Sequence, residues 1–198
     1  METYTLLQNE KAIPITMTLL VSADEIKERV KALGQDLAEK FQGKQPVIIG
    51  ILSGGTIFHA DLTRAMNIPM KTDFLRVSSY QGMESTGKVR EVLGLKTSIE
   101  GEHVILVEDI VDTGTTMDFL LTYFKNLHPA SITVVSLLAK PQKLLKEFRG
   151  SVKVDYIGFN IPSEFVVGYG LDFDGFCREL PAIYQVQTIS GKPVKVHE

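Results

Sequence analysis

The stretch HVILVEDIVDTGTTM, residues 103–117, combines three acidic residues with a turn rich in threonine. The turn DTGTT contains a glycine, which can adopt backbone angles that leave N–H groups unpaired. Unpaired N–H groups at the positive end of a helix dipole bind phosphate, and threonine hydroxyls add further donors. Because the lysine of a GxxxxGK[ST] loop is missing, the turn predicts a phosphate site unlike that of a nucleoside triphosphatase. The predicted phosphate-binding residues are Asp112, Thr113, Gly114, Thr115 and Thr116.

The acidic pair Glu108 and Asp109 indicates a ligand that has a second polar part beside its phosphate. Both residues follow the apolar run Val104–Val107, which predicts a short buried strand with the two carboxylates at its carboxyl end. Since carboxylates accept hydrogen bonds from sugar hydroxyls, a ribose 5-phosphate unit would offer its 2′ and 3′ hydroxyls to the acids and its phosphate to the turn. The alternative is a solvent-exposed acidic loop before an ordinary helix, with Asp112 as the helix N-cap.

Short apolar strands and amphipathic helices alternate along the chain and must position these residues. Ser22–Glu25 has the spacing of a capping box and precedes a helical apolar pattern. Val47–Leu52 is typical of a strand buried on both faces, and the turn Ser53–Thr56 leads from it into a second helical pattern. The same order recurs over residues 104–127, and Ile132–Leu138 is a further apolar strand. The alternation predicts an α/β fold with a central, mainly parallel sheet flanked by helices, and ligands at the carboxyl ends of its strands.

The composition is that of one ordinary globular domain. The 198 residues are 44% hydrophobic and 23% charged, and a net charge of −3 gives no reason to expect a nucleic acid as partner. No apolar run approaches the roughly 18 residues needed to cross a bilayer, so we expect no membrane partner. The one cysteine, Cys177, cannot form an internal disulfide, which favours a cytoplasmic location.

Several motifs carry a family resemblance. VILVEDIVDTGTTM resembles the phosphoribosyl diphosphate (PRPP) binding motif of the type I phosphoribosyltransferases, in which an aliphatic strand, an acid pair and two apolar residues precede Asp-Thr-Gly-x-Thr. The stretches Ser136–Lys140, Asp155–Pro162 and Phe165–Asp172 are similar to the hypoxanthine-guanine phosphoribosyltransferases. The similarity extends from about Val47 to Arg178, which is most of the chain.

The resemblance implies the type I phosphoribosyltransferase fold, with residues 1–198 as a single domain. Residues from about 47 to 160 would form its core, and residues from about 1–20 and 161–198 would form a small hood lobe. An assembly of two or four identical chains, a homodimer or homotetramer, is also implied.

The implied activity is purine salvage. The enzyme would transfer 5-phosphoribosyl from PRPP to N9 of hypoxanthine, guanine or both, with Mg²⁺, giving IMP or GMP and diphosphate. A regulatory protein that senses PRPP on the same fold is the alternative from another class, but a DNA-binding domain or basic face is expected of it, and this acidic chain offers neither. Among transferases, Lys140 disfavours adenine and the Phe165–Asp172 match disfavours orotate, whereas xanthine stays open.

The resemblance also assigns residues to the purine. Asp112 would be the catalytic group that takes the N7 proton and lies near the positive charge that develops on the sugar. Lys140 would donate to O6, which favours an oxo group over an amino group. Phe165 would stack on the base, Ile110 would close its opposite face, and the backbone of Val166 would meet its edge.

Diphosphate and metal are assigned in the same way. Ser53 and Gly54 match the loop that binds diphosphate, where the family has a cis peptide bond after the leucine, and some relatives carry lysine in place of Ser53. Arg178 would reach the diphosphate. Asp172 would hold Mg²⁺, and carbonyl groups near it would help to select the purine.

A polar segment with two glycines, Val77–Arg90, predicts a long loop. Ser79 and Tyr80 at its start resemble the mobile loop of the family, which closes over PRPP and excludes water.

Overall fold

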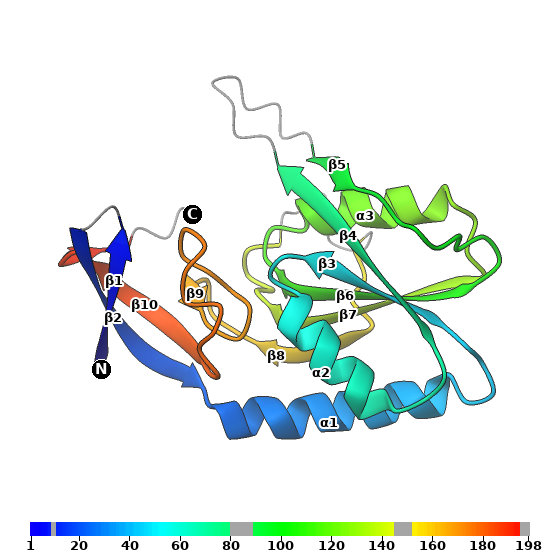
Figure 1. Ribbon diagram of the computed structural model, residues 1–198, viewed down its shortest axis with the longest axis horizontal. Coiled ribbons are helices and arrows are strands. Elements are labelled where there is room, and N and C mark those ends of the chain that lie inside the picture. The colour runs from blue at the N-terminus through cyan, green and yellow to red at the C-terminus, as the bar shows by residue number, and fades with distance from the viewer. Residues whose placement is uncertain (9–10, 80–88, 145–151, 195–198) are drawn as a thin grey trace.

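The computed structural model describes residues 1–8, 11–79, 89–144 and 152–194, whose strands form two sheets (Figure 1). The larger sheet contains β3 (Val47–Leu52), β4 (Lys71–Ser79), β5 (Val89–Leu93), β6 (His103–Val111), β7 (Ser131–Ala139) and β8 (Tyr156–Asn160). Their order is β5-β4-β3-β6-β7-β8, and only β5 is antiparallel to its neighbour in this described part of the chain. The predicted mainly parallel central sheet is confirmed.

Helices cover both faces of this sheet. They are α1 (Ala23–Lys40), α2 (Thr56–Met66) and α3 (Thr115–Lys125). Figure 1 shows α1 and α2 on one face of the sheet and α3 on the other. Helices α1 and α2 pack with Ile48 and Ile105, and α3 packs with Ile49 and Leu106. Because successive residues of a strand point to opposite faces, a sheet covered on both sides needs strands that are apolar without interruption.

The start of α1 follows directly from its sequence. The Ser22 hydroxyl accepts a hydrogen bond from the Glu25 N–H at 3.3 Å, and the Glu25 carboxylate accepts one from the Ser22 N–H at 2.8 Å. These reciprocal bonds satisfy two N–H groups that a helix start leaves without partners. The predicted capping box is confirmed.

The smaller sheet is built from both ends of the chain. It contains β1 (Glu2–Gln8), β2 (Lys11–Val21), β9 (Val166–Val167), β10 (Ile183–Ile189) and β11 (Lys192–Pro193). Strand β10 pairs antiparallel with β2, β9 and β11, and β1 pairs with β2. Figure 1 shows this sheet at the left of the larger one, with β2 leading into α1.

Two predicted boundaries were wrong. The strand predicted to end at Val107 continues to Val111, where it still pairs with β7, so Glu108 and Asp109 lie within β6. Within the predicted loop Val77–Arg90, both ends belong to the paired strands β4 and β5. In both cases hydrogen bonds between backbones extend a strand past its apolar run, because pairing itself requires no apolar side chain. Residues 80–88 lie outside the described residues.

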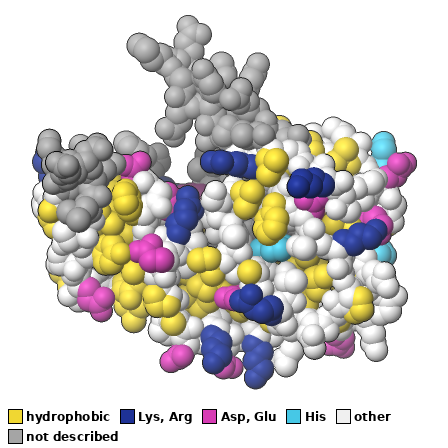
Figure 2. Space-filling view, in the orientation of Figure 1, with side chains coloured by type: hydrophobic (Ala, Val, Ile, Leu, Met, Phe, Trp, Pro, Cys, Tyr) yellow, Lys and Arg dark blue, Asp and Glu magenta, His cyan; other side chains and the backbone are white. Residues whose placement is uncertain are grey.

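The charged side chains on the surface are of both signs, as the small net charge of −3 leads one to expect (Figure 2). On the face that Figure 2 shows, acidic and basic side chains are interspersed over the described residues, and apolar side chains gather over the smaller sheet at the left. None of the helices in the described residues is long and apolar enough to cross a membrane.

Candidate functional site

The last residues of β6 bring an acidic pair into the interior. Glu108 is 8% exposed, and its Oε2 atom has no hydrogen-bond partner among the described residues. Burial, and then the charge of the neighbouring Asp109, raises the pKa of Glu108 well above its usual value. Burial likewise raises the pKa of Asp109 to about 6, although two backbone N–H groups and Arg178 act against this. An acidic pair in this environment is suited to accept hydrogen bonds from a ligand.

The turn at residues 112–116 follows β6 and opens α3. Gly114 is the N-cap of α3 with φ 95°, and no side chain caps the helix. A cavity of about 220 Å³ is lined by Glu108, Ile110 and most residues of the turn. The structure therefore brings Glu108 of the predicted ribose pair and four of the five predicted phosphate residues into one cavity, at a helix start where N–H groups are available to an anion.

Asp112 does not cap α3. Its Oδ2 atom lies 3.1 Å from Nζ of Lys140, which is 6% exposed at the end of β7. Its Oδ1 atom is buried without a hydrogen-bond partner in the described part of the chain, and Nζ of Lys143 lies 3.9 Å away. A second cavity, of about 150 Å³, is lined by Asp112, Lys140 and Pro141 among others. Asp112, the first residue of the turn, thus contacts the buried ammonium group of Lys140 through Oδ2, and its Oδ1 atom is available to accept a hydrogen bond from a ligand.

Lys143 is a residue that the sequence interpretation missed. It follows Lys140 by three residues in the short stretch Lys-Pro-Gln-Lys, and its N–H donates to the Lys140 carbonyl at 3.0 Å. The sequence signal was a second lysine three residues after the first. This spacing indicates a shared site only if the chain is known to turn between the two lysines.

The Leu52–Gly55 loop approaches β6 closely. The peptide bond between Leu52 and Ser53 is cis, as the resemblance predicted. A Cβ atom on Gly54 would overlap the Asp109 carboxylate, so only glycine fits here without movement of the acid. The predicted diphosphate residue Gly54 therefore lies against Asp109 of the acidic pair.

Residues 168–178 bring Asp172 and Arg178 next to the Leu52–Gly55 loop. Nη2 of Arg178 lies 2.7 Å from Oδ1 of Asp172, and Nη1 donates to the Gly170 carbonyl at 2.6 Å. Oδ2 of Asp172 accepts from the Gly175 N–H at 2.7 Å. A Cβ atom on Gly170 would overlap the carbonyl oxygen of Gly54, so this segment packs directly against the Leu52–Gly55 loop.

The predicted purine residues are divided between two apolar clusters. Ile110 packs against the cluster that contains Val166. The Phe165 ring packs against the core of the smaller sheet and lies edge-on to Phe173, with ring centroids 6.4 Å apart. Lys140 and Ile110 thus flank Asp112, while the Phe165 ring lies among residues of the smaller sheet.

The predicted mobile loop is only partly described. Ser79 is the last residue of β4 and is paired with Val89 of β5. Tyr80 lies outside the described residues.

The carboxylates fit Mg²⁺ that is held mainly by a substrate. No cluster of three or more His, Cys, Asp or Glu side chains suited to a metal occurs among the described residues. Protein-bound Mg²⁺ commonly takes one or two carboxylates and completes its coordination with substrate phosphates and water. Asp109 lies against Gly54 of the Leu52–Gly55 loop, and Asp172 is held by Arg178, which also binds the Gly170 carbonyl next to that loop, so both carboxylates are available there.

Fold and site together define a phosphoribosyltransferase, and comparison with known proteins agrees. Residues 22–174 match the family model described as phosphoribosyl transferase domain. The chain is 41% identical over 166 residues to a hypoxanthine-guanine phosphoribosyltransferase of Lactococcus lactis, covering 83% of this chain and 88% of that protein. The chain therefore belongs to the hypoxanthine-guanine phosphoribosyltransferases within that family.

A solved structure and a larger relative extend the comparison. A hypoxanthine phosphoribosyltransferase structure from Staphylococcus aureus matches with a TM-score of 0.79 and 38% identity, covering 85% of this chain and 90% of that one. The bifunctional protein TilS/HprT of Listeria monocytogenes is 39% identical over 83% of this chain. The chain spans only 25% of that protein's length.

Proposed function

We propose that this protein transfers the 5-phosphoribosyl group of PRPP to N9 of hypoxanthine, guanine or both, with Mg²⁺, in purine salvage. The products are IMP or GMP and diphosphate. The observation that carries the proposal is the position of Asp112, which lies between the buried cation of Lys140 and an anion-binding turn. A ligand that places a purine on one side of Asp112 and a phosphate on the other fits this arrangement.

Binding of PRPP uses the turn, the acidic pair and the Leu52–Gly55 loop. The N–H groups and hydroxyls of residues 112–116 bind the 5′-phosphate. Glu108 and Asp109 accept hydrogen bonds from the ribose hydroxyls, which provides the partner that Oε2 of Glu108 lacks among the described residues. Ser53, Gly54 and Arg178 bind the diphosphate. Closure of the loop that includes Ser79 and Tyr80 excludes water.

The base is recognised at Asp112 and Lys140. Lys140 turns its ammonium group from Asp112 to O6 of the purine, so that an oxo group is preferred to an amino group. Ile110 and Phe165 cover the faces of the ring, and the backbones of Val166 and Asp172 meet its edge. The Phe165 ring would reach the base from the side of the smaller sheet.

The transfer itself is a substitution at C1′ of the ribose. N9 forms a bond to C1′ while the bond from C1′ to the diphosphate oxygen breaks, and the bonding electrons leave with diphosphate. The N7 proton passes to Oδ1 of Asp112, the oxygen without a hydrogen-bond partner among the described residues. Asp172 and Asp109 would hold Mg²⁺ together with PRPP, and the bound ion would supply positive charge against the negative charge of the diphosphate.

An ultraviolet assay tests the proposal. PRPP and Mg²⁺ are incubated with hypoxanthine, guanine, xanthine or adenine in turn, and we expect rapid conversion of hypoxanthine or guanine and poor use of adenine. Asp112→Asn should lower kcat by about a hundredfold to ten thousandfold, as for loss of a general base. Asp118→Asn, a matched change in the first turn of α3, should leave the rate within about twofold because Asp118 lies outside the proposed machinery. Conversion of none of the purines would contradict the proposed activity.

We also propose a homodimer or homotetramer in the cytoplasm. The family resemblance supports the assembly, and the buried free thiol of Cys177 is consistent with a reducing compartment. Light scattering coupled to size-exclusion chromatography measures the assembly, and a monomer at micromolar concentration would contradict it.

A further inference from the structure

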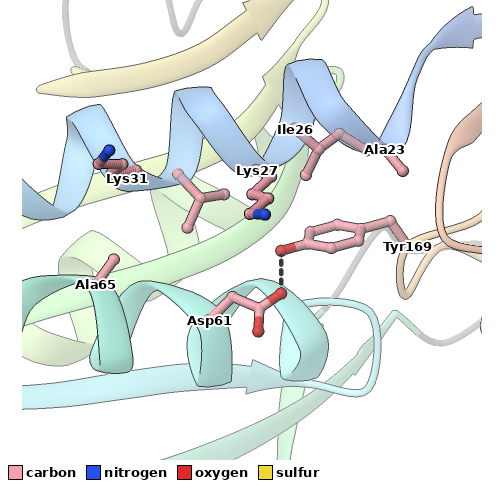
Figure 3. A pocket seen from close by; sticks show the side chains of 8 residues that line it. Ala23, Ile26, Lys27, Lys31, Asp61, Ala65 and Tyr169 are labelled. Atoms are coloured by element: carbon pink, nitrogen blue, oxygen red, sulfur yellow. Dashed lines mark hydrogen bonds between the residues drawn. The ribbon is translucent and has the colours of Figure 1, made fainter.

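A hydrogen bond joins α2 to the segment that carries Asp172 and Arg178. The Tyr169 hydroxyl donates to Oδ2 of Asp61 at 2.6 Å, and Figure 3 shows the ring reaching between α1 and α2 to this carboxylate. Burial, and then the bond to Asp61, raises the pKa of Tyr169, so its hydroxyl remains a donor at neutral pH. Tyr169 is 7% exposed and has a φ of 49°, which large aromatic residues rarely adopt. A residue in this conformation depends on its surroundings to remain there.

Asp61 connects Tyr169 to the Leu52–Gly55 loop. Helix α2 begins at Thr56, directly after the loop, and Asp61 lies within its second turn. The residue after Tyr169, Gly170, packs against the carbonyl oxygen of Gly54. Residues 169 and 170 therefore contact both the loop and the helix that continues from it.

The same two residues fix Arg178. The Tyr169 N–H donates to the Leu180 carbonyl at 2.7 Å, and the Gly170 N–H donates to the Arg178 carbonyl at 3.0 Å. In return, the Arg178 guanidinium donates to the Gly170 carbonyl at 2.6 Å. A displacement of Gly170 would therefore move both the backbone and the side chain of Arg178.

We infer that Tyr169 is a positioning residue for diphosphate: its hydroxyl holds Gly170, and with it Arg178, against the Leu52–Gly55 loop. The inference rests on the proposed function, in which Ser53, Gly54 and Arg178 bind diphosphate. Tyr169 acts through Gly170 and Arg178. Tyr169 thus preorganises Arg178 and the Leu52–Gly55 loop, which are distant in the sequence. Preorganisation strengthens binding because less conformational entropy is lost when the ligand binds.

Tyr169→Phe tests this role while retaining the ring that lines a cavity of about 440 Å³ between α1 and α2. We expect the Kd for magnesium diphosphate, measured by calorimetry, and the KM for PRPP to rise about threefold to tenfold, the factor that corresponds to one hydrogen bond. The kcat and the KM for hypoxanthine should change less than about twofold, since the positioned groups bind diphosphate.

Changes at Asp61 test the same hydrogen bond from the acceptor side, by a conservative variant that keeps the acceptor and by a double variant. Asp61→Asn retains a carbonyl oxygen that accepts from the Tyr169 hydroxyl, and it should bind magnesium diphosphate nearly as the wild type does. Asp61→Leu removes the acceptor and also the solvent-exposed ion pair with Arg64, which contributes little, so it should match Tyr169→Phe. The double variant Tyr169→Phe with Asp61→Leu should show no additional loss, because both changes remove the same bond.

Tyr4→Phe is the matched control. The Tyr4 hydroxyl donates to Oε1 of Glu179 at 2.6 Å. This hydrogen bond has the same kind of donor and acceptor and the same length as that between Tyr169 and Asp61, but it connects the residue after Arg178 to β1 and not to α2. Its loss should leave diphosphate affinity unchanged. An unchanged Kd in Tyr169→Phe, or an equal weakening in Tyr4→Phe, would overturn the inference. A wild-type protein that converts no purine contradicts the proposed function instead, and diphosphate binding still decides the role of Tyr169.

Discussion

The Glu108 carboxylate is buried at the centre of the proposed ribose site. Its pKa is raised, mainly by burial and further by the charge of Asp109. A carboxyl group with a higher pKa in the folded than in the unfolded state favours folding at low pH. This contribution is lost as pH rises from the unfolded value near 4.3 through the folded one. Above that range, the charged Glu108 destabilises the protein that has no ligand.

Glu108→Gln is therefore expected to stabilise the ligand-free protein at pH 8 by about 1 to 2 kcal/mol, because the amide carries no charge. The advantage should shrink at pH 4.5. Urea unfolding at both pH values measures it, and binding of PRPP should weaken in the same variant. Glu100→Gln, a change of an exposed residue, should do neither. Equal or lower stability of Glu108→Gln at pH 8 would count against this account of the buried charge.

Individual residues were predictable where the chemistry is local in sequence. The 112–116 turn could be identified because an acid, a glycine and threonines in one short stretch define an anion site together. Lys140 followed from its place after an apolar strand, within the family resemblance. Lys143 and the contact between Gly54 and Gly170 were not predictable, since each depends on how distant segments pack.

At the scale of elements, Asp73 of β4 ties the segment after β5 to the sheet. Its carboxylate accepts hydrogen bonds from the N–H groups of Phe74, Lys96 and Thr97, at 2.8, 2.8 and 2.7 Å. Burial alone would raise the pKa of Asp73, but the three N–H donors and the Thr97 side chain together outweigh it and lower the pKa. The stabilisation is therefore complete above the unfolded value near 3.9 and is lost as pH falls through the lower folded value.

Asp73→Asn should lower the free energy of unfolding at pH 7 by about 1 to 3 kcal/mol, as expected for a buried charged acceptor of several hydrogen bonds. The difference from the wild type should decrease at pH 3. Chemical denaturation at both pH values gives the comparison. Asp36→Asn on the exposed side of α1 should cost less than about 0.5 kcal/mol. A difference that persisted unchanged at pH 3 would show that the carboxylate charge is not the cause.

Elements were predictable where apolar periodicity determines them. The buried strands and the helix after Ser22 follow from side-chain patterns, and the structure agrees with them. The continuation of β6 to Val111 and the pairing of β4 with β5 were not predictable, because backbone hydrogen bonds do not depend on the type of the side chain. Helix α3 begins at Thr115, inside the turn predicted over residues 112–116, because the last residues of a turn can also form the first residues of a helix.

At the scale of the whole molecule, the segment between β9 and β10 of the smaller sheet contacts the loop after β3 of the larger sheet where Gly170 packs on Gly54. Gly170→Ala should lower the free energy of unfolding by about 2 to 4 kcal/mol, because a Cβ overlaps a backbone oxygen at a φ of 102°. Gly175→Ala is the matched control, since its φ is also positive, at 87°, but open space surrounds its Cβ position. That variant should lose only about 1 to 2 kcal/mol, the cost of the left-handed backbone. Thermal unfolding compares the two, and equal losses would exclude a role for the contact.

The pairing of β2 with β10 also determines when the smaller sheet can form. A ribosome delivers the β1–β2 hairpin early and β10 only after all of the residues between them, so one edge of β2 stays unpaired while the larger sheet assembles. Contacts between such distant segments form slowly, and an unpaired edge is a site for association with other chains. Because β9, which contains Val166, pairs with β10, the proposed purine-binding residues of the smaller sheet come into place last, and a nascent chain carries the complete phosphate turn before it can enclose a base.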